Sequence, residues 1–238
     1  MKRRTFLQTT LALAPYGAGA VGPFTHQPTD NAVVFNAGVG GNNTVDLLAR
    51  IDADCLAQHP ELTILMIGTN DVNSRKHVPI GAYGQNLRQL CTKLKAARSE
   101  VVLMTILPVY EPYLMTRHDP NFYKPEGHPA RTKQLNQLIR DTATSFGLPC
   151  LDMHRVFATV GNIGLDRSSL LKNEANSGKT DGVHPTPDGY RLMAVTVYTF
   201  LTQRQLLRNR IVCFGDSITK GDADDQTYPA YLQRLIAG

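Results

Sequence analysis

Five short apolar runs recur along the chain, and longer stretches that mix polar and apolar positions separate them. The runs are AVVF at 32–35, LTILMI at 62–67, VVLMTIL at 101–107, LPCLD at 148–152 and RIVCF at 210–214. Short runs of aliphatic and β-branched residues are typical of strands buried on both faces of a parallel sheet. The intervening stretches predict helices at 44–59, 79–94, 131–146, 187–207 and 228–236, with Thr44 as the first N-cap and Pro79 as a first helical residue.

This alternation predicts an α/β fold, a three-layer α/β/α sandwich with a five-stranded, mostly parallel, flavodoxin-like sheet. Two long connections interrupt it, a proline-rich loop at 108–129 and a polar segment at about 160–182. In such folds, functional side chains gather in the loops that follow the carboxyl ends of the strands. We therefore expect the polar segment to lie at the surface near a site.

The first 20 residues have the pattern of an export signal. Lys2-Arg3-Arg4-Thr5-Phe6-Leu7 resembles a twin-arginine motif, an apolar stretch follows, and Ala18-Gly19-Ala20 is a small-residue cleavage site. A disordered basic terminus is the alternative. Residues 21–30, with Pro23 and Pro28, then form a linker to a single domain at 31–238. These features predict an exported protein, periplasmic or secreted.

The basic charge of the chain comes largely from this leader. The formal net charge is +5, but Lys2, Arg3 and Arg4 lie in the leader, and 22 basic side chains then remain against 20 acidic ones. No basic stripe is visible, so nucleic acid is not an expected partner. No apolar run approaches the roughly 18 residues that a membrane span requires.

The four cysteines do not suggest a metal site. Cys55, Cys91, Cys150 and Cys213 lie inside apolar helix or strand patterns, no CxxC pair occurs, and no cysteine and histidine have zinc-ligand spacing. Disulfides would suit an exported protein, but buried free thiols fit the pattern better.

A serine and a histidine occupy loops that suit nucleophilic chemistry. Gly215-Asp216-Ser217 directly follows RIVCF, so Ser217 would project from the carboxyl edge of the sheet. A serine nucleophile needs a base, because its hydroxyl is scarcely ionised at neutral pH. In DGVHP at 181–185, His184 can take that proton and Asp181 can orient the imidazole. Each residue also has a structural alternative: Ser217 as a helix cap, His184 as the start of the next helix, and Asp181 as a solvated turn residue.

Two further loops offer donors for a developing negative charge. GTND at 68–71 follows LTILMI, and the Asn70 amide can donate to an oxyanion. NAGVGGNNT at 36–44 follows AVVF, and its glycines let a backbone N–H face a ligand closely. Ordinary turns use the same residue types. The glycine loop does not fit the G-x-G-x-x-G motif of dinucleotide-binding proteins. Gly38 and Gly40 match its first two glycines, but position 43 is Asn, and no acidic residue lies at the end of a second strand. No cofactor is therefore expected.

Together the four segments resemble sequence blocks of the SGNH (GDSL) hydrolase family. GDSITKG at 215–221 is similar to the first block, NAGVGGNNT to the second, GTND to the third and DGVHP to the fifth. The resemblance implies a carboxylic ester hydrolase with Ser217 as nucleophile, His184 as general base and Asp181 as its orienting partner. It also implies an oxyanion hole formed by the N–H groups of Ser217 and Gly41 and the side chain of Asn70, with neither metal nor cofactor.

The order of the blocks departs from the family pattern. The serine block comes last here, whereas the family places it first. We interpret the chain as circularly permuted, with Gly238 continuing naturally into Asn31 as a helix–strand unit. Because domain termini often lie close together, such a rearrangement can preserve a fold.

The resemblance also bears on the substrate. Exported members of the family often remove acetyl groups from carbohydrates, which predicts a small-molecule or polysaccharide ester. Aromatic side chains in the 108–129 loop could stack on sugars or pack the loop onto the domain: Tyr110, Tyr113, Phe122 and Tyr123. A lysophospholipase- or thioesterase-type lipid esterase is one alternative, and a catalytically silent glycan-binding protein is another.

Overall fold

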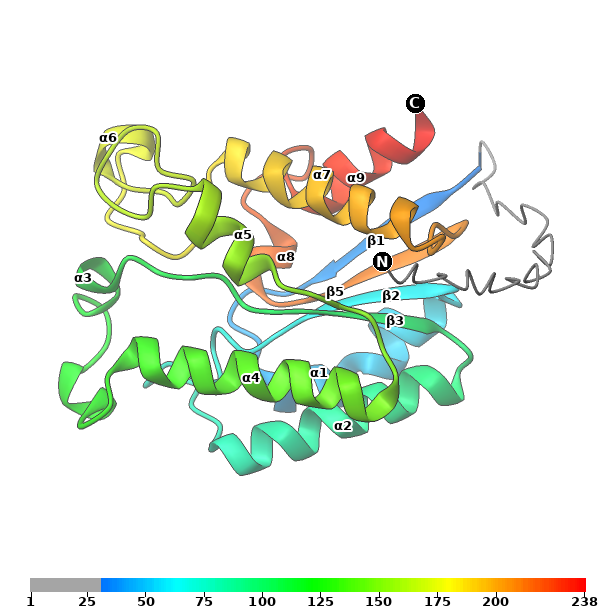
Figure 1. The fold of residues 1–238 in the computed structure, drawn as a ribbon, viewed down its shortest axis with the longest axis horizontal. Helices are drawn as coiled ribbons and strands as arrows, with labels where there is room; N and C mark the ends of the chain where they lie inside the picture. The colour runs from blue at the N-terminus through cyan, green and yellow to red at the C-terminus, as the bar shows by residue number, and fades with distance from the viewer. Residues whose placement is uncertain (1–30) are drawn as a thin grey trace, which may run out of the picture.

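The structure, a computed structural model, describes residues 31–238, so the expected export signal and linker lie outside the described residues. A five-stranded sheet in the order β1-β5-β2-β3-β4 forms the centre, and every pair of neighbouring strands is parallel (Figure 1). The strands are β1 (Val33–Gly38), β2 (Leu62–Met66), β3 (Glu100–Met104), β4 (Cys150–Leu151) and β5 (Arg210–Gly215). The α/β fold with a five-stranded parallel sheet is therefore confirmed.

The last strand in the chain lies inside the sheet, between β1 and β2. Its residues Ile211–Gly215 are buried, which explains the apolar run RIVCF. In the register of the three strands, Gly215 pairs with Gly38 on one side and with Met66 on the other. The three strands therefore end together at one edge, and the loops that follow them begin side by side.

Alternate residues of each strand face opposite helical layers, as the period of two requires. Ile211 and Cys213 belong to one core cluster, whereas Val212 and Phe214 belong to the other. Helices α5 (Met153–Val160), α7 (Pro187–Gln203) and α9 (Tyr228–Ala237) cover the first face. Helices α1 (Thr44–Arg50), α2 (Ile80–Ala96) and α4 (His128–Phe146) cover the second, so that the sheet lies between two layers (Figure 1).

Several boundaries differ from the expectation. Asn43 caps α1 in place of Thr44, because its side chain accepts from the amides of Val45 and Asp46. The expected continuous helix at 44–59 instead ends at Arg50 and continues as a π turn at Ile51–Cys55 and a 3-10 turn at Leu56–Gln58. Pro79 caps α2 and lies one position before its first residue.

The two long connections contain short helices that the sequence pattern did not predict. The 108–129 loop holds α3 (Glu111–Leu114) and the 3-10 turn η3 (Pro120–Tyr123), and the polar segment holds α6 (Glu174–Ser177). Each has four residues, too few to form a legible hydrophobic period. Helix α5 follows β4 directly, where no helix was expected.

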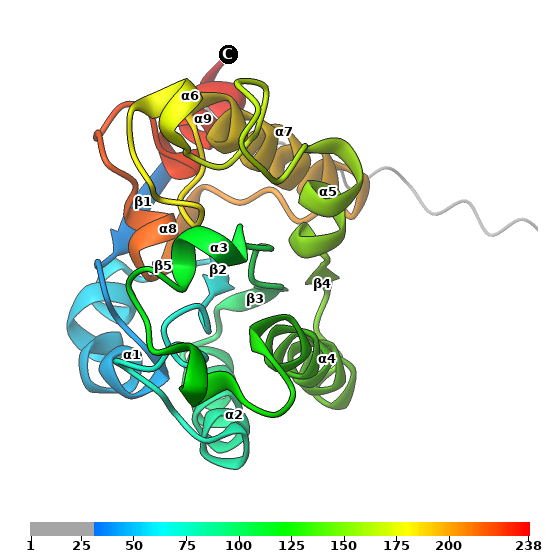
Figure 2. The ribbon, with the colours of Figure 1, turned by 90° about the vertical axis from the view of Figure 1, so that its left-hand side faces the viewer.

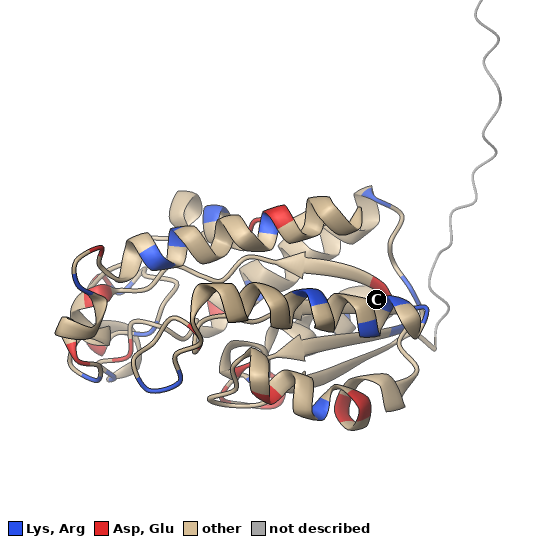
Figure 3. Cartoon of the chain, turned by 90° about the horizontal axis from the view of Figure 1, so that it is seen from below, with Lys and Arg blue, Asp and Glu red and all other residues tan. Residues whose placement is uncertain are grey.

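The cysteines, the surface charges and the apolar character of the helices can be compared with the sequence-based expectations across residues 31–238. The four cysteines are free, three of them are buried, and Cys150 is partly exposed. Basic and acidic residues both occur along the helices seen in Figure 3. None of the helices in residues 31–238 combines the length and the apolar character that crossing a bilayer requires.

Candidate active site

Ser217 is the first residue of the short helix α8 (Ser217–Lys220), two positions after β5 ends. The turn between them is tight. A Cβ on Gly215 would lie 2.3 Å from Thr219 Oγ1 and 2.4 Å from the Met66 carbonyl oxygen, both far inside van der Waals contact. Asp216 caps α8, with its carboxylate accepting a 2.9 Å hydrogen bond from the Ile218 N–H. Only glycine fits before this cap, and the serine side chain is thereby held at the carboxyl edge of the sheet.

His184 connects Ser217 to Asp181. The His184 Nε2 atom lies 2.9 Å from Ser217 Oγ, and His184 Nδ1 lies 2.9 Å from Asp181 Oδ2. The second carboxylate oxygen of Asp181 accepts 2.8 Å hydrogen bonds from the backbone N–H groups of Val183 and His184. The structure thus brings together the serine, histidine and aspartate that the sequence singles out, although 33 residues separate Ser217 from His184.

The environment of Asp181 keeps its carboxylate ionised. Burial by itself would raise its pKa, but the hydrogen bond to and charge of His184, together with the two backbone N–H groups, outweigh burial. The pKa of Asp181 is therefore held well below its usual range. A permanently ionised carboxylate suits the role of orienting an imidazole and stabilising its protonated form.

Backbone pairing fixes the loop that carries His184. The Lys172 N–H donates to the His184 carbonyl, and the Gly182 N–H donates to the Lys172 carbonyl, both at 2.9 Å. The Lys172 side chain is only 9% exposed and forms an ion pair with Asp222, which follows α8. Lys172 therefore joins the histidine loop to the segment that leaves the serine helix.

The segment around α3 packs against the same loop, at the edge that faces the viewer in Figure 2. The Tyr110 N–H donates to the Gly182 carbonyl at 2.7 Å. The Arg117 guanidinium donates to the carbonyl oxygens of Thr180 and Asp181. The loop that presents Asp181 and His184 is therefore held from two sides.

Asn70 and the glycine loop lie against each other beside this centre. Asn70 Nδ2 donates to the Asn42 carbonyl at 2.9 Å, and Asn70 Oδ1 accepts from Asn73 Nδ2 at 3.0 Å. These two bonds fix the plane of the Asn70 amide and leave its second N–H for a ligand. Gly41 has a left-handed φ of +75°, and its amide donates no hydrogen bond within residues 31–238.

The buried carboxylate of Asp71, which has no expected role in the sequence motif, joins these two loops. Asp71 Oδ1 accepts from Thr44 Oγ1 at 2.5 Å and from the Thr44 N–H at 3.0 Å. Burial raises the pKa of Asp71 to about 6, against the lowering effect of the Thr44 hydrogen bonds. Asp71 belongs to the GTND motif, but its partner Thr44 lies 27 residues away, and no local pattern connects the two.

The aromatic side chains of the 108–129 loop mostly pack against the protein. Tyr123 is 2% exposed, and Phe122 packs edge-on against His77 with ring centroids 4.9 Å apart. Arg131 covers the Phe122 ring, with its guanidinium carbon 4.6 Å from the centroid. Of the two interpretations of these rings, packing therefore describes Phe122 and Tyr123. Across residues 31–238, no three His, Cys, Asp or Glu side chains are grouped to hold a metal ion.

Comparison with known proteins assigns the chain to a family by its sequence. The model of the GDSL-like lipase/acylhydrolase family matches residues 16–192, a span that ends before β5 and Ser217. An uncharacterized lipoprotein of Bacillus subtilis strain 168, YqeF, is 26% identical over 191 residues, which is 75% of each chain. An acetylxylan esterase of Geobacillus stearothermophilus is 38% identical over 80 residues, which cover 30% of this chain and 36% of that enzyme.

Solved structures share the fold at low sequence identity. A GDSL-like lipase of Bacteroides thetaiotaomicron superposes with a TM-score of 0.56 at 21% identity, covering 75% of this chain and 92% of the other. At this identity the likeness concerns the fold alone, whereas the family match spans most of the sequence. The chain therefore belongs to the GDSL-like lipase/acylhydrolase family and is a carboxylic ester hydrolase.

Proposed function

We propose that Ser217, His184 and Asp181 form a catalytic triad that hydrolyses esters through an acyl-enzyme. The 2.9 Å contact between His184 Nε2 and Ser217 Oγ carries this proposal, because it puts a base within reach of the hydroxyl proton. Asp181 holds the opposite nitrogen of the same ring, so that Nδ1 keeps its proton and Nε2 stays free to accept one.

The reaction then follows in two halves. Ser217 Oγ attacks the ester carbonyl carbon while its proton passes to His184 Nε2, and the carbonyl oxygen becomes an oxyanion. The intermediate collapses as the C–O bond to the alcohol breaks, and His184 returns the proton to the departing alcohol. Water repeats the sequence on the acyl-enzyme, so the products are an acid and the free serine.

In the same proposal, three donors stabilise the oxyanion: the N–H groups of Ser217 and Gly41 and the second Nδ2–H of Asn70. Support comes from the common end of β1, β5 and β2, because the loops with these donors start from paired strand ends. The free amide of Gly41 and the fixed amide plane of Asn70 are suited to this role, since preorganised donors need no rearrangement during the reaction.

As substrates we propose short acyl esters, acetyl in particular, carried on carbohydrates. The observation that supports this choice is the similarity to an enzyme named acetylxylan esterase, at 38% identity over 80 residues. A series of p-nitrophenyl esters from acetyl to long chain, with acetylated xylan beside it, tests the choice. Rates that fall with chain length support it, and a preference for long chains would favour a lipid esterase.

Two further proposals concern the chain as a whole. We propose that it is an exported protein with a leader at 1–20, and the naming of the B. subtilis relative as a lipoprotein supports export. We also propose that the chain is circularly permuted. If β5 is counted first, the sheet order β1-β5-β2-β3-β4 becomes 2-1-3-4-5, the flavodoxin-like order.

Ser217→Ala and Asp181→Asn test the triad. We expect Ser217→Ala to abolish turnover of p-nitrophenyl acetate. We expect Asp181→Asn to lower kcat by about 10²–10⁴-fold. The Asn oxygen can still accept from the loop amides, which leaves its NH₂ facing His184 Nδ1, and the imidazole must then present Nε2–H to the serine.

Ser74→Ala is the matched control, because Ser74 Oγ lies 2.9 Å from His118 Nδ1, in a serine–histidine pair that has no carboxylate partner for His118 among residues 31–238. We expect this variant to keep the wild-type rate and Ser217→Ala to keep the wild-type unfolding curve. Equal activity in Ser217→Ala and wild type would reject the triad, and an inactive wild type would favour the glycan-binding alternative.

A further inference from the structure

The side chain of Arg50, the last residue of α1, donates hydrogen bonds to four other residues. Its Nη2 donates to the carbonyl oxygens of Ala37 at 3.0 Å and Gly215 at 2.8 Å, and its Nε donates to Asn42 Oδ1 at 2.6 Å. Its side chain is 15% exposed. A guanidinium with this little solvent contact is held in one orientation by partners that lie on three different segments.

These partners lie where the proposed oxyanion donors are carried. Ala37 is at the end of β1, immediately before the glycine loop, and Gly215 ends β5 two residues before Ser217. Asn42 follows Gly41 directly, and its carbonyl oxygen accepts the 2.9 Å hydrogen bond from Asn70 Nδ2. Arg50 therefore contacts Asn42, which adjoins Gly41 and accepts from Asn70, and also contacts Gly215, two residues before Ser217.

Hydrogen bonds hold both ends of the glycine loop, through Asn36 at one end and through Asn43 and Thr44 at the other, whereas residues 39–42 between them have fewer restraints. Their backbone–backbone hydrogen bonds are the 3.2 Å bond from the Val39 N–H to the Gly215 carbonyl and the 3.3 Å bond from the Asn42 N–H to the Val39 carbonyl. Gly40 and Gly41 are exposed, and nothing lies within 4 Å of a Cβ placed on either. Glycine loses the most conformational freedom on ordering, so this loop needs an external restraint to hold a donor still.

The far side of the guanidinium is also fixed. Arg50 Nη1 pairs with Asp54 at 2.9 Å, and the guanidinium carbon lies 4.6 Å from the centroid of the Phe214 ring. A planar fork can serve the carbonyls, the Asn42 oxygen and Asp54 at once, whereas a lysine ammonium cannot reproduce that geometry.

We propose that Arg50 is a positioning residue that aligns the Gly41 and Asn70 donors with Ser217. The proposal rests on the oxyanion role given to those donors in the proposed function. Removal of the guanidinium releases Asn42, and with it both the preceding Gly41 amide and the acceptor that orients the Asn70 side chain. Catalysis then loses preorganised donors while the remote parts of the substrate bind as before.

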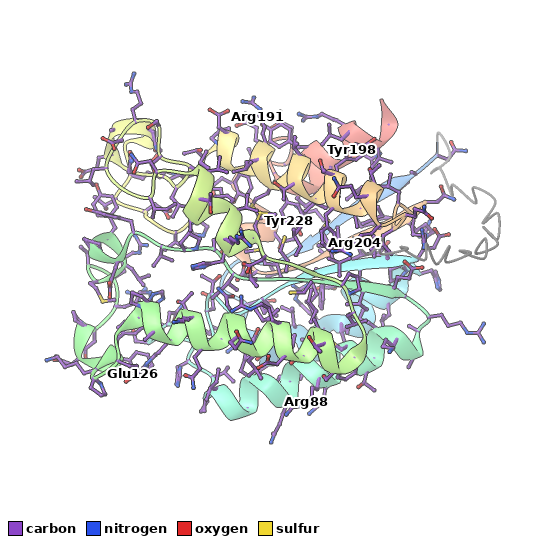
Figure 4. All side chains as sticks on the ribbon, in the orientation of Figure 1. Arg88, Glu126, Arg191, Tyr198, Arg204 and Tyr228 are labelled. Carbon is purple, nitrogen blue, oxygen red and sulfur yellow. The ribbon has the colours of Figure 1, made fainter. Side chains whose placement is uncertain are left out.

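The kinetic test compares Arg50→Ala and Arg50→Lys with Arg88→Gln, a change at an exposed arginine that projects outward from α2 (Figure 4). We expect Arg50→Ala to lower kcat by about 10–100-fold with little change in KM, since one lost oxyanion donor typically costs about 10²–10³-fold. Arg50→Lys should stay impaired, added guanidinium should partly restore Arg50→Ala, and Arg88→Gln should match wild type.

A double-mutant cycle tests whether Arg50 affects kcat through Asn42. Asn42→Ala should lower kcat as Arg50→Ala does, and the double variant should be no slower than the slower single variant, because both changes release the same loop. Asp54→Asn removes the ion pair but leaves the bonds to Asn42, Ala37 and Gly215, so we expect a rate within about threefold of wild type. Fully multiplicative losses in the double variant would contradict positioning through Asn42.

Hydrogen exchange measured by mass spectrometry gives a readout that needs no turnover. Arg50→Ala should speed exchange in peptides that cover residues 38–44, and should leave exchange in α7 unchanged. If exchange speeds up in an enzyme without esterase activity, the loop restraint stands and the proposed function fails. If Arg50→Ala keeps the wild-type kcat or the wild-type exchange at 38–44, the positioning role of Arg50 is rejected.

Discussion

At the scale of single residues, three aspartates near the proposed site have pKa values shifted in different directions, two upward and one downward. Asp71 and Asp216 are fully buried, and burial raises the pKa of each to about 6. Asp181 is also largely enclosed, but His184 and two backbone N–H groups hold its pKa well below the usual range. The number of donors and positive charges around a carboxylate therefore decides which aspartate stays ionised in mildly acidic solution.

The raised pKa of Asp216 predicts a pH-dependent contribution to stability. Its pKa is about 6 in the folded chain, against about 3.9 for an unfolded aspartate. Between about pH 4 and 6 the unfolded chain gives up this proton while the folded chain keeps it, so the free energy of unfolding falls as pH rises. Below pH 4 both states are protonated, and the full contribution is present there.

Asp216→Asn should remove this dependence, because an amide oxygen can still cap α8 without a charge. Urea unfolding at pH 4.5, 5.5, 6.5 and 7.5 measures it. We expect the wild type to lose about 1–3 kcal/mol more stability than Asp216→Asn between pH 4.5 and 7.5. Asp71 is present in both chains, and its charge contributes to the raised pKa of Asp216, so the comparison measures Asp216 together with its interaction with Asp71. Parallel pH curves for the two chains would contradict this prediction.

At the scale of elements, the position of His184 depends on a short helix in a different loop. The segment that begins α3 approaches the histidine loop so closely that a Cβ on Gly182 would lie 2.9 Å from the Tyr110 carbonyl oxygen and 3.0 Å from Tyr113 Cβ. Gly182 also has a left-handed φ of +68°. Close approach and backbone conformation both select glycine here, and each can be tested separately.

Gly182→Ala and Gly178→Ala separate the two effects. Gly178 has nearly the same φ, +66°, but nothing lies within 4 Å of its added Cβ. We expect Gly178→Ala to lose about 1 kcal/mol of stability through strain alone and to keep the wild-type kcat. Gly182→Ala should lose more stability and should lower kcat at least tenfold, because α3 must move away from the loop that carries His184. Denaturation and p-nitrophenyl acetate kinetics on both variants check this, and equal behaviour of the two would refute the role of α3.

At the scale of the whole molecule, the last strand and the last helix pack against β1, the first strand. Strand β5 pairs with β1 and β2, and α9 packs on α7 and β1. Gln233 of α9 accepts from the Val34 N–H at 2.6 Å and donates to the Ala32 carbonyl at 2.9 Å. The carboxyl-terminal helix and the start of β1 are therefore neighbours in space.

A reordered chain tests the proposed permutation. In it, residues 205–238 come first, and a short Gly–Ser linker joins Gly238 to Asn31. The cut falls after Arg204, in an exposed turn, so every strand and helix stays intact. Compared with residues 31–238 in their present order, we expect the same unfolding midpoint within a few degrees and the same kcat within about threefold. An insoluble or inactive reordered chain would show that the present order is required.

Local sequence patterns predicted much of this molecule, and the reason is physical. Strands such as RIVCF are buried on both faces, so their apolar runs are legible without knowledge of their partners. The site motifs directly follow strands or precede a helix, which predicts that Ser217 and Asn70 follow the carboxyl ends of their strands, although Ser217 proves to be the first residue of α8. Helices α3, α6 and α8 have four residues each and escaped prediction, because such short helices depend on tertiary packing more than on a period. Helix α5, with eight residues, was also missed.

The residues that hold the site were harder to find for a different reason. Arg50 contacts Gly215 across 165 positions of sequence, and Arg117 contacts Asp181 across 64. Both bind backbone carbonyl oxygens, which every residue has, so no complementary side-chain motif marks the partner. Arginine at a helix end or in a loop is common, and only the fold reveals what it contacts.

The central place of β5 has a consequence for synthesis. Strands β1 and β2 do not pair with each other, so their inner edges stay open on the ribosome until residues 210–215 emerge. Unpaired strand edges can associate with other chains, so the nascent chain is prone to aggregation until β5 has emerged. Ser217 also emerges after His184, so a chain that stops before residue 210 lacks both the middle strand of its sheet and the proposed nucleophile. If Ser217 is the nucleophile, as proposed, hydrolytic activity cannot begin before residues 210–217 have been made.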